Sequence, residues 1–214
     1  MNKDLLEKTL LYVKEKFEND YSGHDYYHSV RVYKLAVSMC KKENADLEIV
    51  QLASLLHDVD DYKLFNGKTG LCTNAEAFLK ENKVLDAKIK TICSIISAIS
   101  FKGTDTKIPE SIEGKIVQDA DRLDAIGAIG IARTFAYGGS RNRSMHIPDE
   151  KPRENMNFQE YSASNGTSIN HFYEKLLKLK DLMNTEIAKK MAESRHKYME
   201  DFLSEFYSEW DGIK

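Results

Sequence analysis

The sequence predicts an all-α protein. Apolar residues recur at a spacing of three to four nearly throughout the 214 residues, which is typical of the buried face of a helix. Three prolines and 11 glycines leave long stretches uninterrupted, and no segment is convincing as a strand. We expect one domain over 1–214, a helical bundle with its core over about 20–137, on which a loop and C-terminal helices over 138–214 pack.

The apolar spacing places six helices in the first two thirds of the chain. They are expected over 3–19, from His28 onward, over 46–58, 73–82, 85–99 and 113–137. The helix over 46–58 is apolar on most sides, so it is expected to be central. Inside the helix over 113–137, Gly127 and Gly130 each lower helix stability by roughly 1 kcal/mol. We expect them to permit close approach of a neighbouring helix.

The region from Gly138 to about Thr167 shows no periodicity and is expected to be a long loop. Long irregular segments in compact domains tend to be functional lids or disordered. Two helices should follow, one with Ser168 as its N-cap and apolar residues as far as Met183, and one that starts near Thr185 and buries residues as far as Trp210. The aromatic pattern of the last helix indicates core or dimer packing, so a homodimer is possible.

Composition and charge favour a soluble cytoplasmic protein. The net charge of −3 and the lack of a basic face with interleaved aromatic residues exclude nucleic-acid binding as a first hypothesis. Charged residues at the N-terminus stand where a signal peptide would have its apolar core, and no apolar run approaches the ~20 residues of a membrane-spanning helix. Cys40, Cys72 and Cys93 lie among apolar neighbours and are expected to be reduced thiols.

Histidine and aspartate residues form a candidate metal site. His57 and Asp58 end an apolar helix, His28 lies in the first turn of an earlier one, and an aspartate is expected at the start of a third. Imidazole and carboxylate suit a divalent metal, although hydrogen-bonded histidines and capping aspartates would give the same spacing. The candidates for the last ligand are Asp119, Asp121 and Asp124.

Helical phase does not choose among these three carboxylates, because both of the faces that they share with apolar residues could point inward. Three carboxylates within six residues repel one another, which argues for a cation nearby.

These residues and their flanking segments resemble the HD-domain metal-dependent phosphohydrolases. His28, the pair His57-Asp58 and the segment 118–124 match the His…His-Asp…Asp signature in order, and residues 23–32 are similar to the first motif of the family. The family's last ligand is the Asp of an Ala-Asp-x-Leu segment, which is Asp121 here. The resemblance extends from about residue 20 to 211, and the C-terminal part is similar to bacterial standalone HD hydrolases.

The resemblance implies one divalent metal ion, held by His28, His57, Asp58 and Asp121. Members of the similar bacterial subgroup cleave nucleoside triphosphates to monophosphate and pyrophosphate and favour Mn²⁺, while Mg²⁺, Co²⁺, Ni²⁺ or Fe²⁺ would suit the same ligands. Two-metal relatives carry further histidines on the helix that reads Ile92–Ser100 here, where no histidine occurs. A mononuclear site is therefore expected.

Two aspartates are candidates for assisting the water that attacks phosphorus. Asp61, four residues after His57, matches the position of a carboxylate that activates water in related enzymes, and a carboxylate near the metal is a reasonable general base. Asp124 is the alternative, and it would otherwise orient Arg122 or a water on the metal. His24 is expected to orient His28 or to contact phosphate.

A phosphate substrate also requires positive charge. Lys63 follows the segment that contains His57 and Asp58. His171 and Lys175 share a face at the start of a helix, whose free N–H groups favour anions. Arg141 and Arg143 belong to the loop, which would close over the substrate as a lid. Exposed helix and loop residues would show the same pattern.

The predicted function is the hydrolysis of (deoxy)nucleoside triphosphates to monophosphate and pyrophosphate through a metal-activated water. A nucleotide monophosphatase and a guanosine-alarmone hydrolase are alternatives with the same ligand set. A metal-stabilised helical binding or regulatory module is an alternative of another class.

Overall fold

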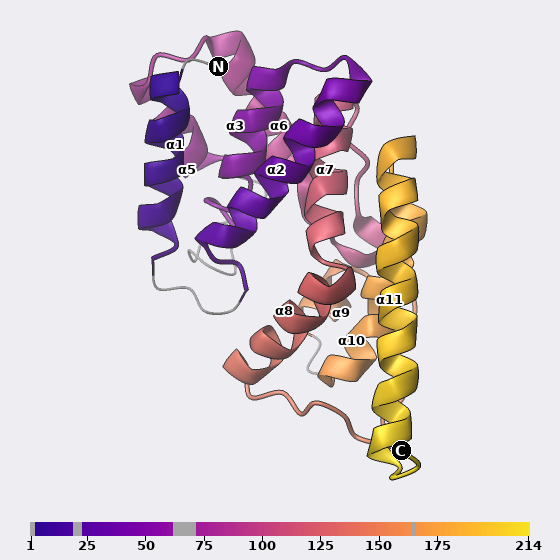
Figure 1. The fold of residues 1–214 in the computed structure, drawn as a ribbon. Helices are drawn as coiled ribbons and strands as arrows, with labels where there is room; N and C mark the ends of the chain where they lie inside the picture. Colours follow the sequence, from indigo (N-terminus) through magenta and orange to yellow (C-terminus); the bar gives the residue numbers. More distant parts are fainter. Residues whose placement is uncertain (1–2, 19–22, 62–71, 164–165) are drawn as a thin grey trace.

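A computed structural model describes residues 3–18, 23–61, 72–163 and 166–214 of the chain (Figure 1). This part of the chain holds ten α-helices and two short 3-10 helices and contains no strand. The prediction of an all-α fold is therefore confirmed. None of the helices in these ranges is both long and apolar enough to cross a membrane.

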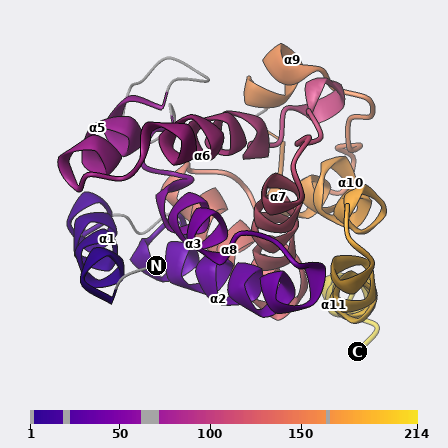
Figure 2. The ribbon, with the colours of Figure 1, turned by 90° about the horizontal axis from the view of Figure 1, so that it is seen from above.

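The first half of the chain forms a bundle around a central helix. Its helices are α1 (Lys3–Lys16), α2 (Tyr26–Glu43), α3 (Leu47–Leu56), α5 (Thr73–Glu81) and α6 (Asp86–Ile99). Every side chain of α3 from Val50 to Leu56 is buried, because α1, α2, α6 and α7 (Ile112–Asp124) all pack against it. Figure 2 shows α2, α3 and α7 side by side at the centre. The end of α3 therefore lies inside the molecule.

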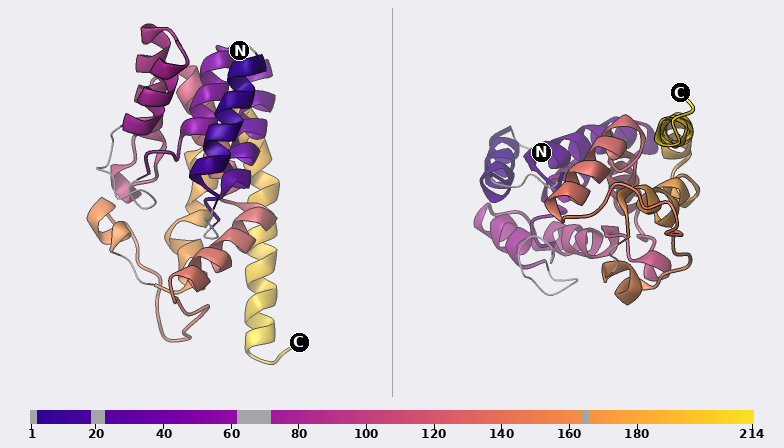
Figure 3. Two further views of the ribbon diagram at one scale, coloured as in Figure 1. Left: turned by 90° about the vertical axis from the view of Figure 1, so that its left-hand side faces the viewer. Right: turned by 90° about the horizontal axis from the view of Figure 1, so that it is seen from below.

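The second half covers one side of this bundle. After α7 come α8 (Gly127–Ser140), α9 (Phe158–Ser162), α10 (Ser168–Glu174) and α11 (Glu186–Trp210), with 3-10 helices at Gly103–Asp105 and Leu176–Leu182. The long helix α11 packs against α7 and α8 and runs along the molecule to the C-terminus (Figures 1 and 3). Helices α8 and α10 therefore lie on the side of the bundle that carries His57 and Asp58.

The predicted helix over 113–137 is two helices. Ala125 ends α7, Ile126 is extended, and α8 begins at Gly127 with a φ of +75°. Gly127 permits close approach of α11, as expected, since an added Cβ would lie 3.0 Å from the Cβ of Arg195. Apolar residues continue across the break, because Ile131 and Phe135 of α8 pack partly buried against the core, so the pattern alone does not reveal the change of direction.

Further boundaries also differ from the predictions. Helix α8 continues to Ser140, so the loop after it begins later than Gly138 and is interrupted by α9. Thr167, rather than Ser168, caps α10 by accepting a hydrogen bond from the amide of Asn170, and the chain then turns into a 3-10 helix. Thr185 caps α11 as predicted.

The expectation of three reduced thiols is wrong for two of the cysteines. Cys72 and Cys93 form a disulfide, with Cα atoms 5.4 Å apart, whereas Cys40 is buried and free. The two residues are 21 positions apart, and they meet because α5 packs against α6. Linear spacing does not show this packing.

Replacing Gly127 by alanine should destabilise the fold. A left-handed φ costs an alanine about 1–2 kcal/mol, and the new methyl group would press on Arg195 at 3.0 Å. We expect the melting temperature to fall by several degrees. Gly139→Ala on the same helix is the matched control, because a Cβ there meets nothing within 4 Å. Equal melting temperatures for the two variants would contradict this account.

Candidate metal centre and active site

Four side chains from three helices converge on one point. His28 lies in the first turn of α2, His57 and Asp58 follow directly after α3, and Asp121 lies in the last turn of α7. The Nε2 atoms of His28 and His57 are 3.1 Å apart. Asp58 Oδ2 lies 3.3 Å from both nitrogens, and Asp121 Oδ1 lies 3.5 and 3.8 Å from them. Asp121 is therefore at the end of its helix rather than at the expected start.

The local sequence explains why the two histidines point inward. The carboxylate of Asp25 caps α2 by accepting the amide of His28 at 2.8 Å, which places His28 one turn before the buried Val32. His57 follows the buried segment Val50–Leu56 of α3 and donates from Nδ1 to the carbonyl of Ser54 at 2.9 Å. The cap thus positions His28 on the inward face of α2, and a backbone carbonyl orients the imidazole of His57.

The hydrogen bonds of the two imidazoles leave an unpaired set of lone pairs. The Nδ1 of His28 lies 2.8 Å from a carboxylate oxygen of Asp124, and the Nδ1 of His57 faces a carbonyl oxygen. Both acceptors require a proton on Nδ1, so both Nε2 atoms of the neutral rings present lone pairs to each other and to two carboxylates. Such a set repels itself unless a cation lies among its members. Ligands about 2.1 Å from one ion would be separated by roughly 3.0–3.5 Å, as most of these atoms are.

The electrostatic field at this point favours positive charge. Burial alone would lower the pKa of His57, but the carboxylates of Asp58 and Asp121 outweigh it and raise that pKa to about 9. Burial would likewise raise the pKa of Asp58, yet the neighbouring histidines hold it well below its usual range. The four side chains can therefore hold a divalent cation, which would take the place of the extra proton on the imidazole of His57.

The structure distinguishes the three aspartates of α7. Asp121 faces the two imidazoles and is one of the residues that line a cavity. Asp119 points to the other side, where it accepts hydrogen bonds from Asn184 and Thr185 just before α11. Desolvation raises the pKa of Asp119. Its role is to tether α11, and the geometry agrees with Asp121 as the metal ligand.

Asp124 lies behind the cluster at the centre of a buried ionic network. One of its oxygens accepts from His28 Nδ1 at 2.8 Å and from Arg133 at 2.9 Å, and the other accepts from Arg31 at 2.7 Å. Burial opposes ionisation of Asp124, but these three donors outweigh it and lower its pKa below the usual range. The side chain is 2% exposed, so it faces His28 rather than a substrate. It does not orient Arg122, which donates to the carbonyl of Leu182.

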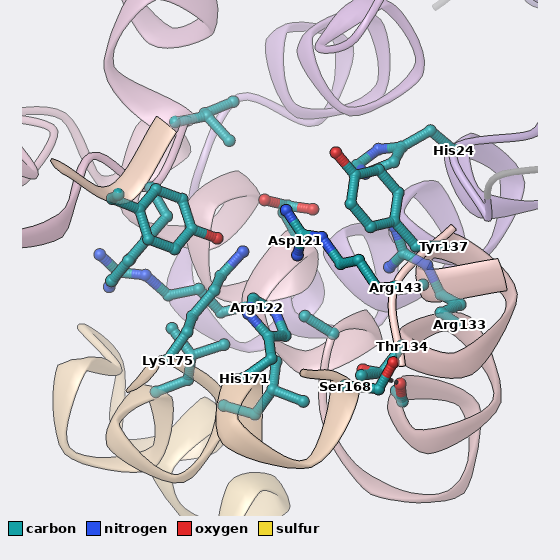
Figure 4. Close-up of a pocket in the computed structure, with 18 residues that line it drawn as sticks. His24, Asp121, Arg122, Arg133, Thr134, Tyr137, Arg143, Ser168, His171 and Lys175 are labelled. Carbon is teal, nitrogen blue, oxygen red and sulfur yellow. Dashed lines mark hydrogen bonds between the residues drawn. The ribbon is translucent and has the colours of Figure 1, made fainter. Parts of the chain in front are cut away.

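The cavity beside the cluster collects most of the predicted substrate-binding residues (Figure 4). His24, Asp121, Arg143, His171 and Lys175 all line it. The Nδ1 of His24 lies 3.2 Å from Asp58 Oδ2, so His24 contacts a metal ligand rather than His28 by hydrogen bonding. Its imidazole meets that of His28 edge-on, with ring centroids 5.4 Å apart.

Of three further predicted residues, one is outside the described part of the chain and the other two are not among the residues that line the cavity. Lys63 is outside the described residues. Arg141 is exposed and lies over the ring of Tyr137, and it is not among the residues that line the cavity. The amide of Asp61 donates to the carbonyl of Asp58 at 3.0 Å. Among the described residues around the cavity, the carboxylate of Asp61 does not occur.

Sequence reasoning did not single out several residues of this site. Arg133 of α8 reaches both Asp124 and the carbonyl of Gly23, at 2.9 and 2.8 Å, and no motif marks it. Phe101, Tyr137 and Tyr161 line the cavity from three separate segments. Arg31 was detectable, because it lies one helical turn after His28 and so on the same face.

The family comparison agrees with this geometry. A family model for the HD domain matches residues 25–126, a range that includes the whole four-residue cluster. The protein YpgQ of Bacillus subtilis is 38% identical over 209 residues, which cover 97% of this chain and 94% of YpgQ. The chain belongs to the HD-domain family.

Solved structures of similar proteins share the fold over nearly the whole chain. A protein from Lactobacillus plantarum is 39% identical and superposes with a TM-score of 0.89 over 99% of both chains. An HD-superfamily hydrolase from Bacillus thuringiensis is 46% identical, with a TM-score of 0.74 over 98% of both chains. YpgQ in complex with ADP is 34% identical, with a TM-score of 0.77 over 98% of this chain and 100% of that one. This chain is a metal-dependent phosphohydrolase of that superfamily.

Replacing Asp124 by asparagine should weaken metal binding without unfolding the protein. The carboxylate that accepts from His28 is lost, and outer-shell partners of metal-bound histidines are typically worth about 10- to 100-fold in affinity. Titration calorimetry with Mn²⁺ on chelator-treated protein measures this. Asp119→Asn is the matched control, since it alters a buried carboxylate of the same helix that holds Asn184 and Thr185. It should lower the melting temperature and leave metal affinity within about twofold. Equal metal affinity in both variants would refute the role given to Asp124.

Proposed function

We propose that this protein hydrolyses (deoxy)nucleoside triphosphates to monophosphate and pyrophosphate, with Mn²⁺ as the favoured ion. The observation that carries the proposal is the charge of the cavity that opens beside the metal ligand Asp121. Four cationic side chains line it, namely Arg122, Arg133, Arg143 and Lys175, and Asp121 is the one carboxylate among its described lining residues.

This charge suits a polyphosphate better than a single phosphate. A nucleoside triphosphate carries about four negative charges and a monophosphate about two, so several guanidinium and ammonium groups around one metal site favour the longer chain. The structure of YpgQ with ADP supports a nucleotide as the ligand of this cavity, since YpgQ and this chain align over nearly their full lengths.

The proposed reaction is a displacement at the α-phosphorus. The oxygen of water forms a bond to that phosphorus, the bond from phosphorus to the oxygen that bridges to the β-phosphate breaks, and that oxygen leaves with pyrophosphate. His28, His57, Asp58 and Asp121 would hold a divalent cation, which would supply Lewis acidity for the water and for a phosphoryl oxygen. Guanidinium groups that line the cavity bind and orient the triphosphate.

We assign the proton of the attacking water to Asp61. Asp124 is surrounded by His28, Arg31 and Arg133 and points away from the cavity, so its contacts support a positioning role instead. Asp61 is partly exposed and lies in the turn that follows Asp58, three residues after that ligand candidate. A carboxylate beside a metal site is a suitable proton acceptor.

Pyrophosphate release tests the proposal. The chelator-treated protein, supplied with Mn²⁺ and a panel of ribo- and deoxyribonucleoside triphosphates, should release pyrophosphate and little orthophosphate. Asp58→Ala should abolish this release because it removes one of the four ligands. Asp60→Asn is the matched control: Asp60 caps α5 through the amides of Asn74 and Ala75 and should retain activity. Orthophosphate without pyrophosphate would instead establish a phosphatase. Metal binding without turnover would favour an alarmone hydrolase or a binding module.

Asp61→Asn should lower kcat while leaving metal affinity unchanged. The amide keeps the size of the side chain but accepts no proton, and loss of a general base typically costs 10²- to 10⁴-fold. Single-turnover rates at saturating Mn²⁺, measured beside Mn²⁺ affinity, separate this effect from that of Asp124→Asn. A kcat equal to that of the unaltered protein would exclude Asp61 as the base.

A further inference from the structure

The cavity has two chemically different sides, with Asp121 between them (Figure 4). Arg122, His171 and Lys175 lie on one side, and His24, Tyr137 and Arg143 lie on the other. The guanidinium of Arg122 is turned to the carbonyl of Leu182. We call the first the aromatic side, which Phe101 and Tyr161 complete through their contacts with Lys175 and His171. We call the second the guanidinium side, which Arg133 completes.

The aromatic side is a cluster of partly exposed rings from separate segments. Phe101 follows α6, Tyr161 belongs to α9 and His171 to α10. The rings of Phe101 and Tyr161 meet edge to face at a centroid distance of 5.2 Å, and those of Tyr161 and His171 are within 29° of parallel at 6.4 Å. The ammonium of Lys175 lies 5.1 Å from the centre of the Phe101 ring and 5.9 Å from that of Tyr161.

These contacts give the aromatic side a preference for a planar ligand. Cation–π attraction holds Lys175 against the rings, so its charge is partly engaged on this side. Partly exposed aromatic faces stack readily on a nucleobase, and such stacking tolerates any base because every base has a π face.

The guanidinium side is built differently. The guanidinium of Arg143 lies 5.5 Å from the centre of the Tyr137 ring. Arg133 is fixed by the carbonyl of Gly23 and the carboxylate of Asp124. Planar guanidinium groups match phosphate oxygens two at a time, and those that are already held by the protein lose little freedom when they bind.

From this division we infer the orientation of the substrate: the nucleobase occupies the aromatic side and the leaving pyrophosphate occupies the guanidinium side. The inference rests on the proposed function, because attack at the α-phosphorus requires that phosphate to lie at the metal ligands between the two sides. The base and the β- and γ-phosphates must then extend in opposite directions. His171 and Lys175, expected from the sequence to clamp the phosphates, fall beside the nucleoside instead.

Binding of the two reaction products tests this orientation separately from turnover. Adenosine monophosphate and inorganic pyrophosphate are titrated into the full-length protein in the presence of Mg²⁺, and their dissociation constants are compared. Tyr161→Ala should raise the dissociation constant of adenosine monophosphate about tenfold or more and change that of pyrophosphate by less than about twofold. Arg143→Ala should do the reverse, because a charge-assisted phosphate contact is lost.

Matched variants sharpen the result. Tyr161→Phe retains the ring and should bind adenosine monophosphate nearly as well as the unaltered protein. Arg141→Ala removes a neighbouring guanidinium that also lies 5.5 Å from the centre of the Tyr137 ring but does not line the cavity. This variant should leave the affinity for both products unchanged. Unchanged pyrophosphate binding in Tyr161→Ala also shows that this variant is folded.

The opposite pattern would overturn the orientation: Tyr161→Ala would then weaken the binding of pyrophosphate, and Arg143→Ala that of adenosine monophosphate. Equal weakening of both products by both variants, or binding of neither product to the unaltered protein, would overturn it as well. An unaltered protein that binds both products on the assigned sides but releases no pyrophosphate from any triphosphate would refute the proposed function and leave the two-sided assignment standing.

Discussion

The architecture depends on a buried set of electron-pair donors that repel one another. Two imidazole nitrogens lie 3.1 Å apart, and two carboxylate oxygens lie within 3.8 Å of both. Without a positive charge among them these lone pairs repel one another, so the set needs a proton or a metal ion at its centre as well as packing that holds its members together. That packing is the contact of α2, α3 and α7 with one another. The bundle thus maintains a site that becomes favourable when a cation enters it.

Asp124 connects this centre to the rest of the protein. A carboxylate that is 2% exposed is costly to ionise, and His28, Arg31 and Arg133 offset that cost. The same contacts orient His28 and, through Arg133, fasten α8 to the carbonyl of Gly23 beside His24. Helix α8 also lines the cavity, so a single buried ionic network positions both His28 and part of the cavity wall.

The sequence was sufficient for the features that depend on local order. The helices of the first half followed from apolar spacing, and the cluster of His28, His57, Asp58 and Asp121 followed from the resemblance to a family with ordered motifs. The features that depend on three-dimensional packing were missed. The pairing of Cys72 with Cys93 requires α5 to pack on α6. Helical phase placed Asp119 and Asp121 equally well, because both faces of α7 are in fact buried, one against α2 and α3 and the other toward α11.

The turn between α7 and α8 shows why the missed features matter for function. A single straight helix over 113–137 would satisfy the apolar pattern, but it would carry Arg133, Thr134 and Tyr137 away from Asp121. The left-handed conformation at Gly127 and the extended Ile126 redirect the chain instead. Helix α8 then lies against α10, and residues of both line one cavity with the metal ligand. A glycine, which has no side chain, therefore permits the turn that brings the cavity beside the cluster of His28, His57, Asp58 and Asp121.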